Sequence, residues 1–215
     1  MADILIDAQS TPSAPSSGQG VIWLDSTAKI ICCRDDAGRV QAWSGNAAIA
    51  AQGAGFATDT YVTNSGILIP LFGFQAKARF LWQISASKTG AGTAQPIYNI
   101  RIGANQTTAD TARLTLTGPA QTAIADIGTL NIVVTVRSIG AAGVIQGTAF
   151  WSHRGTAAST TVSGTGFAND VTGHVEGTSA GFDNQNLGGQ YIGLSINGGT
   201  SASWTLTQVQ AEAGW

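Results

Sequence analysis

Charged residues are scarce in this sequence. Asp, Glu, Lys and Arg together make up 10% of its 215 residues, whereas soluble domains usually carry about 25%. The 10 basic and 12 acidic residues leave a formal net charge of -2, so there is no excess positive charge to displace counterions from a phosphate backbone. The composition therefore excludes a basic nucleic-acid-binding surface, and we expect no nucleic-acid partner.

Long apolar runs are also missing. No stretch approaches the roughly 18–20 apolar residues that span a bilayer, and the N-terminus has no basic region followed by an apolar core. Apolar residues nevertheless make up 43% of the chain and recur in short runs, which excludes a disordered chain of low hydrophobicity. We therefore expect a folded protein that is made in a cytoplasm and does not insert into a membrane.

Side chains suited to metal and redox chemistry are rare. The two cysteines, Cys32 and Cys33, are adjacent. Neighbours in a strand point to opposite faces, so a disulfide between them would be strained. We expect one to be buried and the other exposed, with a vicinal redox pair as the alternative. No further cysteine or nearby histidine pair completes a zinc site, and we expect neither a metal nor another cofactor.

No pattern typical of an active site stands out, and the protein is predicted not to be an enzyme. The histidines are His153 and His174, and neither belongs to a Ser/His/Asp spacing of the kind used in nucleophilic catalysis. Glu176, close to His174, lies between glycines and is predicted to be in a loop. Trp151, His153 and Arg154 follow one another closely; they either contact a sugar or receptor, or simply end a strand.

The first 45 residues form a segment of their own. A Pro/Ser-rich stretch, Thr11–Gly18, precedes short apolar runs at Val21–Leu24, Lys29–Cys33 and Arg39–Trp43, and turn-forming residues separate these runs. This pattern predicts a three-stranded meander, which is only marginally stable without a partner surface or copies of itself. Residues 46–64 are the predicted linker, in which Ala47–Ala51 forms a short helix or an ordered loop.

From residue 65 to residue 215 the pattern is nearly all strand. The run Ala78–Ala86 alternates and places Phe80, Trp82 and Ile84 on one face, and Leu130–Ile139 alternates in the same way. The other runs occupy Gly66–Leu71, Ile97–Ile102, Ala112–Leu116, Gly143–His153, Gln190–Ile196 and Ser203–Val209. We therefore predict an all-β domain built as an antiparallel β-sandwich, with a jelly roll as the favoured topology.

Tryptophan is the aromatic residue with the clearest positional meaning here. Trp82 and Trp204 lie in alternating runs and are predicted core residues. Trp215 is the last residue of the sequence and is predicted to dock at a subunit interface. Trp23 and Trp43 lie in the runs of the N-terminal segment and are predicted to anchor its partner.

The N-terminal segment resembles the short module that opens many tailed-bacteriophage fibre and other virion appendage proteins. The matching residues are Thr11, Pro12, Ala14, Pro15, Ser17, Gly18, Trp23, Ser26, Lys29, Ile30, Asp35, Asp36, Gly38 and Val40. The sequence departs from the usual pattern at Cys32-Cys33, where polar or small residues are more common.

The resemblance implies an attachment or trimer-nucleating role for residues 1–45 and a β domain presented outward. The scarcity of charge agrees, because charged side chains are costly to desolvate in a subunit interface. We therefore expect a virion-located, homotrimeric short fibre, spike or decoration subunit that contacts other proteins of the capsid or tail. The alternatives are a receptor-binding tail protein that contacts host surface glycan and a small polysaccharide hydrolase. The predicted docking residues are Pro12, Pro15, Trp23, Trp43 and Trp215.

Overall fold

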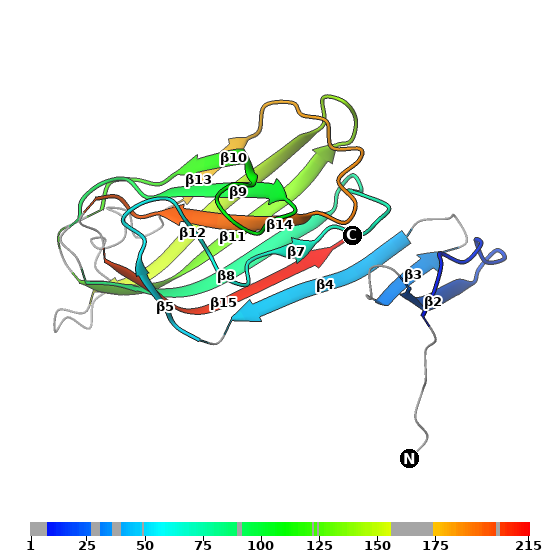
Figure 1. Ribbon diagram of the computed structural model, residues 1–215, viewed down its shortest axis with the longest axis horizontal. Coiled ribbons are helices and arrows are strands. Elements are labelled where there is room, and N and C mark those ends of the chain that lie inside the picture. The colour runs from blue at the N-terminus through cyan, green and yellow to red at the C-terminus, as the bar shows by residue number, and fades with distance from the viewer. Residues whose placement is uncertain are drawn as a thin grey trace, which may run out of the picture.

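Two antiparallel sheets packed face to face make up the body of the protein (Figure 1). A computed structural model describes residues 8–26, 31–35, 40–48, 50–89, 92–121, 123, 125–155, 174–200 and 203–215. Strands, turns and irregular segments account for all of these residues. Among them, no helix has the length and apolar character needed to cross a bilayer. The predicted all-β sandwich is therefore confirmed, and the jelly-roll topology stays a prediction.

The larger sheet extends from the N-terminal strands to the far edge of the sandwich. Its order is β1-β2-β3-β4-β15-β8-β11-β12-β13, with β5 also paired to β15. The strands are β1 (Ala8–Gln9), β2 (Gly20–Asp25), β3 (Ile31–Asp35), β4 (Val40–Ala48), β5 (Gln52–Gly55), β8 (Arg79–Lys88), β11 (Asp126–Ser138), β12 (Val144–Gly155), β13 (His174–Thr178) and β15 (Trp204–Gly214).

The smaller sheet covers one face of the larger sheet. Its order is β10-β9-β14-β6, with β7 also paired to β14. The strands are β6 (Thr60–Tyr61), β7 (Ile67–Leu68), β9 (Ile97–Gly103), β10 (Thr111–Thr117) and β14 (Tyr191–Asn197). Strands β6 and β14 pair although they are far apart in the sequence, so long-range contacts hold this sheet together.

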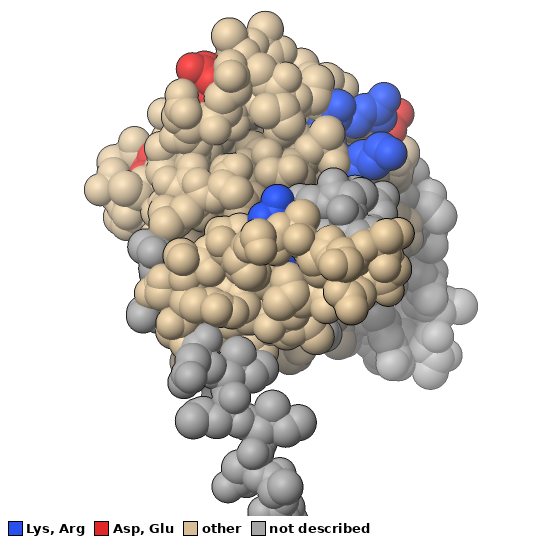
Figure 2. Space-filling view, turned by 90° about the vertical axis from the view of Figure 1, so that its right-hand side faces the viewer, with Lys and Arg blue, Asp and Glu red and all other residues tan. Residues whose placement is uncertain are grey.

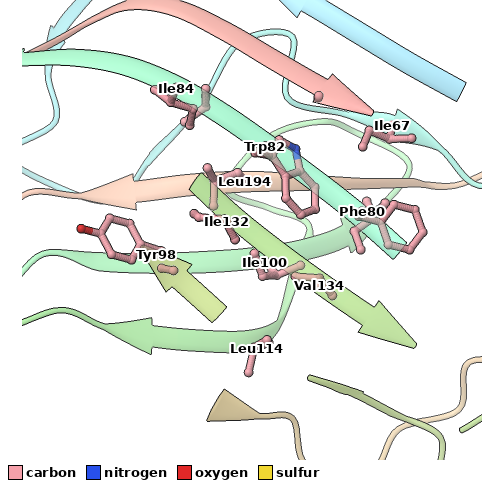
Figure 3. Close-up of a cluster of buried hydrophobic side chains, with 14 of the residues drawn as sticks. Ile67, Phe80, Trp82, Ile84, Tyr98, Ile100, Leu114, Ile132, Val134 and Leu194 are labelled. Carbon is pink, nitrogen blue, oxygen red and sulfur yellow. The ribbon is translucent and has the colours of Figure 1, made fainter. Parts of the chain in front are cut away.

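The core lies between the sheets and follows the period of two that strand geometry imposes. In β8, Phe80, Trp82 and Ile84 are fully buried while Arg79 and Gln83 are exposed, as predicted. Figure 3 shows these three side chains together with Tyr98, Ile100 and Leu194 from the facing smaller sheet and Ile132 and Val134 from the neighbouring strand β11. Each such large apolar side chain stabilises the fold by about 1.5–3 kcal/mol through burial.

Tryptophans occupy the centre of this core. Trp82 and Trp204 are fully buried, as predicted. The Nε1 of Trp82 donates to the backbone oxygen of Ser65 over 2.7 Å, and the Nε1 of Trp204 donates to Oε1 of Gln121 over 3.1 Å. These hydrogen bonds remove the cost of burying the indole N–H groups.

Strand β4 joins the N-terminal strands to the sandwich. Residues 40–42 pair with β3, and the continuation from Trp43 to Ala48 pairs with β15. The predicted boundary at residue 45 therefore lies inside a strand. Ala47 and Ala48 are in that strand and not in the short helix expected there, because their backbone hydrogen bonds complete the ladder with β15. The strands β5 and β6 occupy part of the predicted linker.

The loop predicted around Glu176 is in fact strand β13. Glycines on both sides of Glu176 suggested a loop, but Gly177 has a packing role: a Cβ there would come within 3.0 Å of Cδ2 of Leu116. Glycine thus lets β13 lie close to the smaller sheet while pairing with β12.

Candidate functional site

The N-terminal meander, which consists of β2, β3 and residues 40–42 of β4, meets the sandwich at a groove. The groove has a volume of about 550 Å³ and is mainly apolar. Figure 2 views the molecule from this end, where most of the described surface is neither acidic nor basic. The groove is lined by Ile22, Ile31, Cys32, Cys33, Arg79, Leu81, Glu212, Ala213, Gly214 and Trp215.

Trp23 and Trp215 hold the meander against the sandwich. Trp23 is fully buried and forms a small cluster with Cys32, against which Phe72 and Trp215 pack. Trp215 also packs against the main core, where its ring meets that of Phe80 at a centroid distance of 5.1 Å and an interplanar angle of 89°. Of the three predicted docking tryptophans, Trp23 and Trp215 therefore have partners within their own chain.

The face of the meander that borders the groove is apolar and open. Ile22 is 64% exposed and Ile31 is 54% exposed. In the β2–β3 register, Leu24 lies opposite Ile31 and Ile22 lies opposite Cys33, so these four residues share the face that Trp23 does not. A sheet face with two largely exposed isoleucines is typical of a contact surface.

Cys32 contributes no reactive thiolate to the groove. Both cysteines are thiols, with Cys32 buried and Cys33 half-buried. Burial, followed by the charge of Asp25 and by Cys33, raises the pKa of the Cys32 thiol to about 11. Cys32 is therefore protonated at neutral pH and is not a nucleophile. In the part of the chain that the structure describes, no three His, Cys, Asp or Glu residues are grouped to hold a metal ion.

The Pro/Ser-rich stretch lies against the meander. Pro12 and Pro15 are half-buried, and Nη1 of Arg34 donates to the backbone oxygen of Pro12 over 2.6 Å. Trp43 pairs with Gly214 through its backbone, and its side chain lies outside the described part. The structure thus places Pro12 against β3 of the meander.

The predicted ligand-contact residues lie in β12, away from the groove. Trp151 is 1% exposed and packs edge to face on Trp204, with centroids 5.4 Å apart at 85°. Its indole does not reach the surface, so of the two alternatives the structure favours a strand residue packed in the core over a ligand contact for Trp151. The reason is register, because odd-numbered residues of β12 face the core. The side chains of His153 and Arg154 lie outside the described residues.

A second surface is the outer face, meaning the side of β15, β8, β11, β12 and β13 that points away from the smaller sheet. Cross-strand pairing sets Glu212, Leu81, Val133, Thr148 and Glu176 side by side in one row. The three central residues of this row are uncharged and half-buried, and both glutamates are exposed. The acidic side chains thus lie at the two ends of the row.

An adjacent row of the outer face also lacks acidic and basic residues at its centre. It consists of Gln210, Gln83, Asn131, Phe150 and His174. Phe150 is 40% exposed there, and Ile127, on the same side of β11, is 47% exposed. Arg79 and Arg137 are exposed at the margins. The centre of the outer face therefore carries neutral polar and apolar groups, with charges of both signs around it.

Comparisons with known proteins identify no family for this chain. No family model and no curated protein matches this sequence. Among solved structures, the legume lectin-like domain from Entamoeba histolytica is similar over 77% of this chain and 89% of that chain, with 10% sequence identity and a TM-score of 0.25. At that TM-score the likeness supports no conclusion about the fold or the function.

Sequence reasoning missed Ile22, Ile31 and Phe72. The first two have a signal in the sequence: the runs Val21–Leu24 and Ile30–Cys33 are apolar at every position, which is typical of a strand covered on both faces. Phe72 lies in a turn with no periodicity around it, so only the fold brings it to Trp23.

Proposed function

We propose that this protein is a non-enzymatic bacteriophage virion protein, a homotrimeric short fibre, spike or decoration subunit. The observation that supports the proposal best is the absence of charge from the centre of the outer face, among the described side chains. Interface centres are depleted of charged residues, and their rims are polar. The trimeric state and the virion location rest on the resemblance of residues 11–40 to appendage modules.

A further copy of this chain is the proposed occupant of the outer face. The face has acidic residues at Glu176 and Glu212 and basic residues at Arg79 and Arg137, all exposed, so its rim is electrostatically complementary to itself. The face also exposes Phe150 and Ile127. Around a three-fold axis, such a face packs against the corresponding faces of two further copies without burying an unpaired charge.

The open face of the meander is the proposed attachment surface for the particle. It presents Ile22 and Ile31 at the end of the molecule that also bears the C-terminus (Figure 1). The opposite face is already packed on Trp215 through Trp23, so a partner on Ile22 and Ile31 leaves the attachment to the sandwich intact.

Light scattering of the full chain tests self-assembly. We expect a mass of about three times the 21.9 kDa of one chain at micromolar concentration. Val133→Arg places a charge at the centre of the outer face and is expected to give monomers. Ala112→Arg, at an exposed position on β10, is the matched control and should remain trimeric. A monomeric wild type, or a trimeric Val133→Arg variant, would contradict the proposal.

Incorporation into particles tests the attachment surface. The double variant Ile22→Ser/Ile31→Ser should fold and trimerise but be lost from purified virions by at least tenfold. Leu71→Ser, at a residue that is 54% exposed outside the meander, is the control and should be incorporated normally. Equal incorporation of the double variant would show that the particle is contacted elsewhere.

A further inference from the structure

A polar cleft lies on the smaller sheet, and none of its lining residues belongs to the outer face or the meander. It has a volume of about 470 Å³ and opens between the segment that contains β6 and the loop that follows β9. Eight residues line it: Asp59, Thr60, Tyr61, Thr63, Asn64, Gln106, Thr107 and Thr108. From its geometry we infer that this cleft binds a neutral saccharide, independently of how the protein assembles.

Beside the cleft, a buried network holds Asp59 in place. Arg101 forms an ion pair with Asp59 and donates from Nε to Oγ of Ser195 over 2.7 Å. Its Nη1 donates to the backbone oxygens of Thr108 and Asp110 over 3.0 and 2.6 Å. The Arg101 side chain is only 11% exposed. The charge of the Arg101 guanidinium is thus neutralised by Asp59, and all three of its nitrogens already donate within the protein. Arg101 therefore does not attract a free anion.

Asp59 is equally well satisfied. Its Oδ1 accepts hydrogen bonds from Oγ of Ser195 over 2.7 Å and from Nδ2 of Asn99 over 3.1 Å, while its other oxygen pairs with Arg101. The carboxylate remains 30% exposed and fixed in orientation. It is therefore a preorganised acceptor for a ligand hydroxyl and not a free charge for a cation.

Tyr61 provides an aromatic surface in this cleft. Its backbone lies opposite Ser195 in the β6–β14 register, yet its hydroxyl reaches the position that a Cβ on Gly193 would occupy. The side chain therefore runs along β14, two residues from its own partner. The hydroxyl oxygen is sealed from solvent, and burial raises the pKa of the phenol. The half-buried ring, and not the hydroxyl, is the part that a ligand can contact.

The other wall is rigid. Asp110 is 4% exposed and accepts hydrogen bonds from the backbone N–H groups of Asn105 and Gln106 over 3.0 and 2.8 Å. The Gln106 side chain lies over Gly66, where a Cβ would collide with it. Asn64 and Gln106 both have positive φ, at 59° and 53°. Both walls are thus held in shape before a ligand arrives, which lowers the entropy cost of binding.

The lining selects the ligand class. Threonine hydroxyls, the amides of Asn64 and Gln106, and the Asp59 carboxylate offer both hydrogen-bond donors and acceptors. The ring of Tyr61 offers an apolar surface beside them. A saccharide combines hydroxyl groups with a face of C–H groups that stacks on an aromatic ring. A purely apolar ligand would leave the polar lining unsatisfied.

An array of neutral mono- and oligosaccharides, followed by saturation-transfer NMR with each bound probe, tests the inference on the full chain. We expect the wild type to bind at least one probe and Tyr61→Ala to bind it at least tenfold more weakly. Tyr61→Phe should bind within twofold of wild type, because it retains the ring. Tyr191→Ala, a half-buried tyrosine on the same sheet but outside the cleft, is the matched control and should bind normally.

A second variant protects the test against misfolding. Asn64→Gly removes an amide from the rim at a positive φ of 59° that glycine adopts without strain, and it is also expected to weaken binding at least tenfold, with an unchanged circular dichroism spectrum. The inference is overturned if no neutral probe binds, if only acidic glycans bind, or if both Tyr61→Ala and Asn64→Gly bind as the wild type does. Light scattering separates the two proposals, since Tyr61→Ala should assemble exactly as the wild type assembles.

Discussion

The ring of Trp215 meets the ring of Phe72 edge to face, with centroids 6.0 Å apart and an interplanar angle of 84°. Phe72 packs on the small cluster of Trp23 and Cys32, whereas Trp215 packs on both that cluster and the main core. The last residue of this sequence is therefore a structural link between the meander and the sandwich.

Replacing Trp215 should loosen the meander. Trp215→Ala removes ring contacts to Phe72, Phe74 and Phe80, and we expect the free energy of unfolding to fall by about 2–3 kcal/mol, below the 3–5 kcal/mol of a fully buried tryptophan. Urea unfolding followed by far-ultraviolet circular dichroism measures this loss. Trp215→Phe should lose less than half as much. Equal stability of wild type and Trp215→Ala would contradict the linking role.

Lys88 and Asp126 should be energetically coupled. They lie directly opposite each other in β8 and β11, and both are fully buried. Lys88→Met leaves a buried carboxylate without its cation and should cost about 3–5 kcal/mol. The double variant Lys88→Met/Asp126→Leu should cost much less than the sum of the single changes. Chemical denaturation of the four proteins in the cycle measures the coupling, and simple additivity would disprove it.

The hydroxyl of Tyr98 should stabilise the fold through its hydrogen bond with Trp151. Nε1 of Trp151 donates to that hydroxyl, and both residues are buried. Tyr98→Phe leaves a buried N–H without an acceptor, and we expect a loss of about 1–3 kcal/mol in unfolding free energy. Tyr191→Phe, at a half-buried site, should change stability by less than about 0.5 kcal/mol. Similar losses in the two variants would show that the hydrogen bond contributes nothing specific.

Cys32 should make the fold sensitive to alkali. Its thiol has a pKa raised from 9.0 to about 11, so between these pH values the unfolded chain loses the proton while the folded chain keeps it. The stabilisation is complete below pH 9 and is lost as the pH rises through 11. Urea unfolding at several pH values should show a shallower decline for Cys32→Ala than for the wild type. Val21→Ala is the control, because Val21 packs against the same small cluster and carries no titratable group, and it should retain the wild-type slope.

Much of the fold can be predicted from alternation alone. The side chains of Phe80, Trp82 and Ile84 are buried as their period of two indicates, because successive residues of any strand face opposite sides. The closeness of Trp151 to His153 and Arg154 in sequence makes it a candidate for a ligand contact. Its burial depends on the register between β11 and β12, which no local pattern specifies.

The candidate sites depend even more on long-range structure. Ser195 donates to Asp59 across 136 positions of sequence, and Tyr61 lies over Gly193. Neither pair has a spacing that would draw attention to it. At the junction of the meander and the sandwich, Trp23 and Trp215 could be proposed from the sequence as contact residues, while their packing within the same chain could not.

The sequence by itself determined that this protein is a β-sandwich with very little charge, because strand periodicity and composition are local properties. Only the tertiary structure decided which surface lacks charged residues and which polar side chains come into contact. Pairing in both sheets sets uncharged residues side by side on the outer face and brings Asp59, Arg101 and Ser195 together beside the cleft. That pairing results from packing the whole core at once, and no segment of the chain specifies it alone.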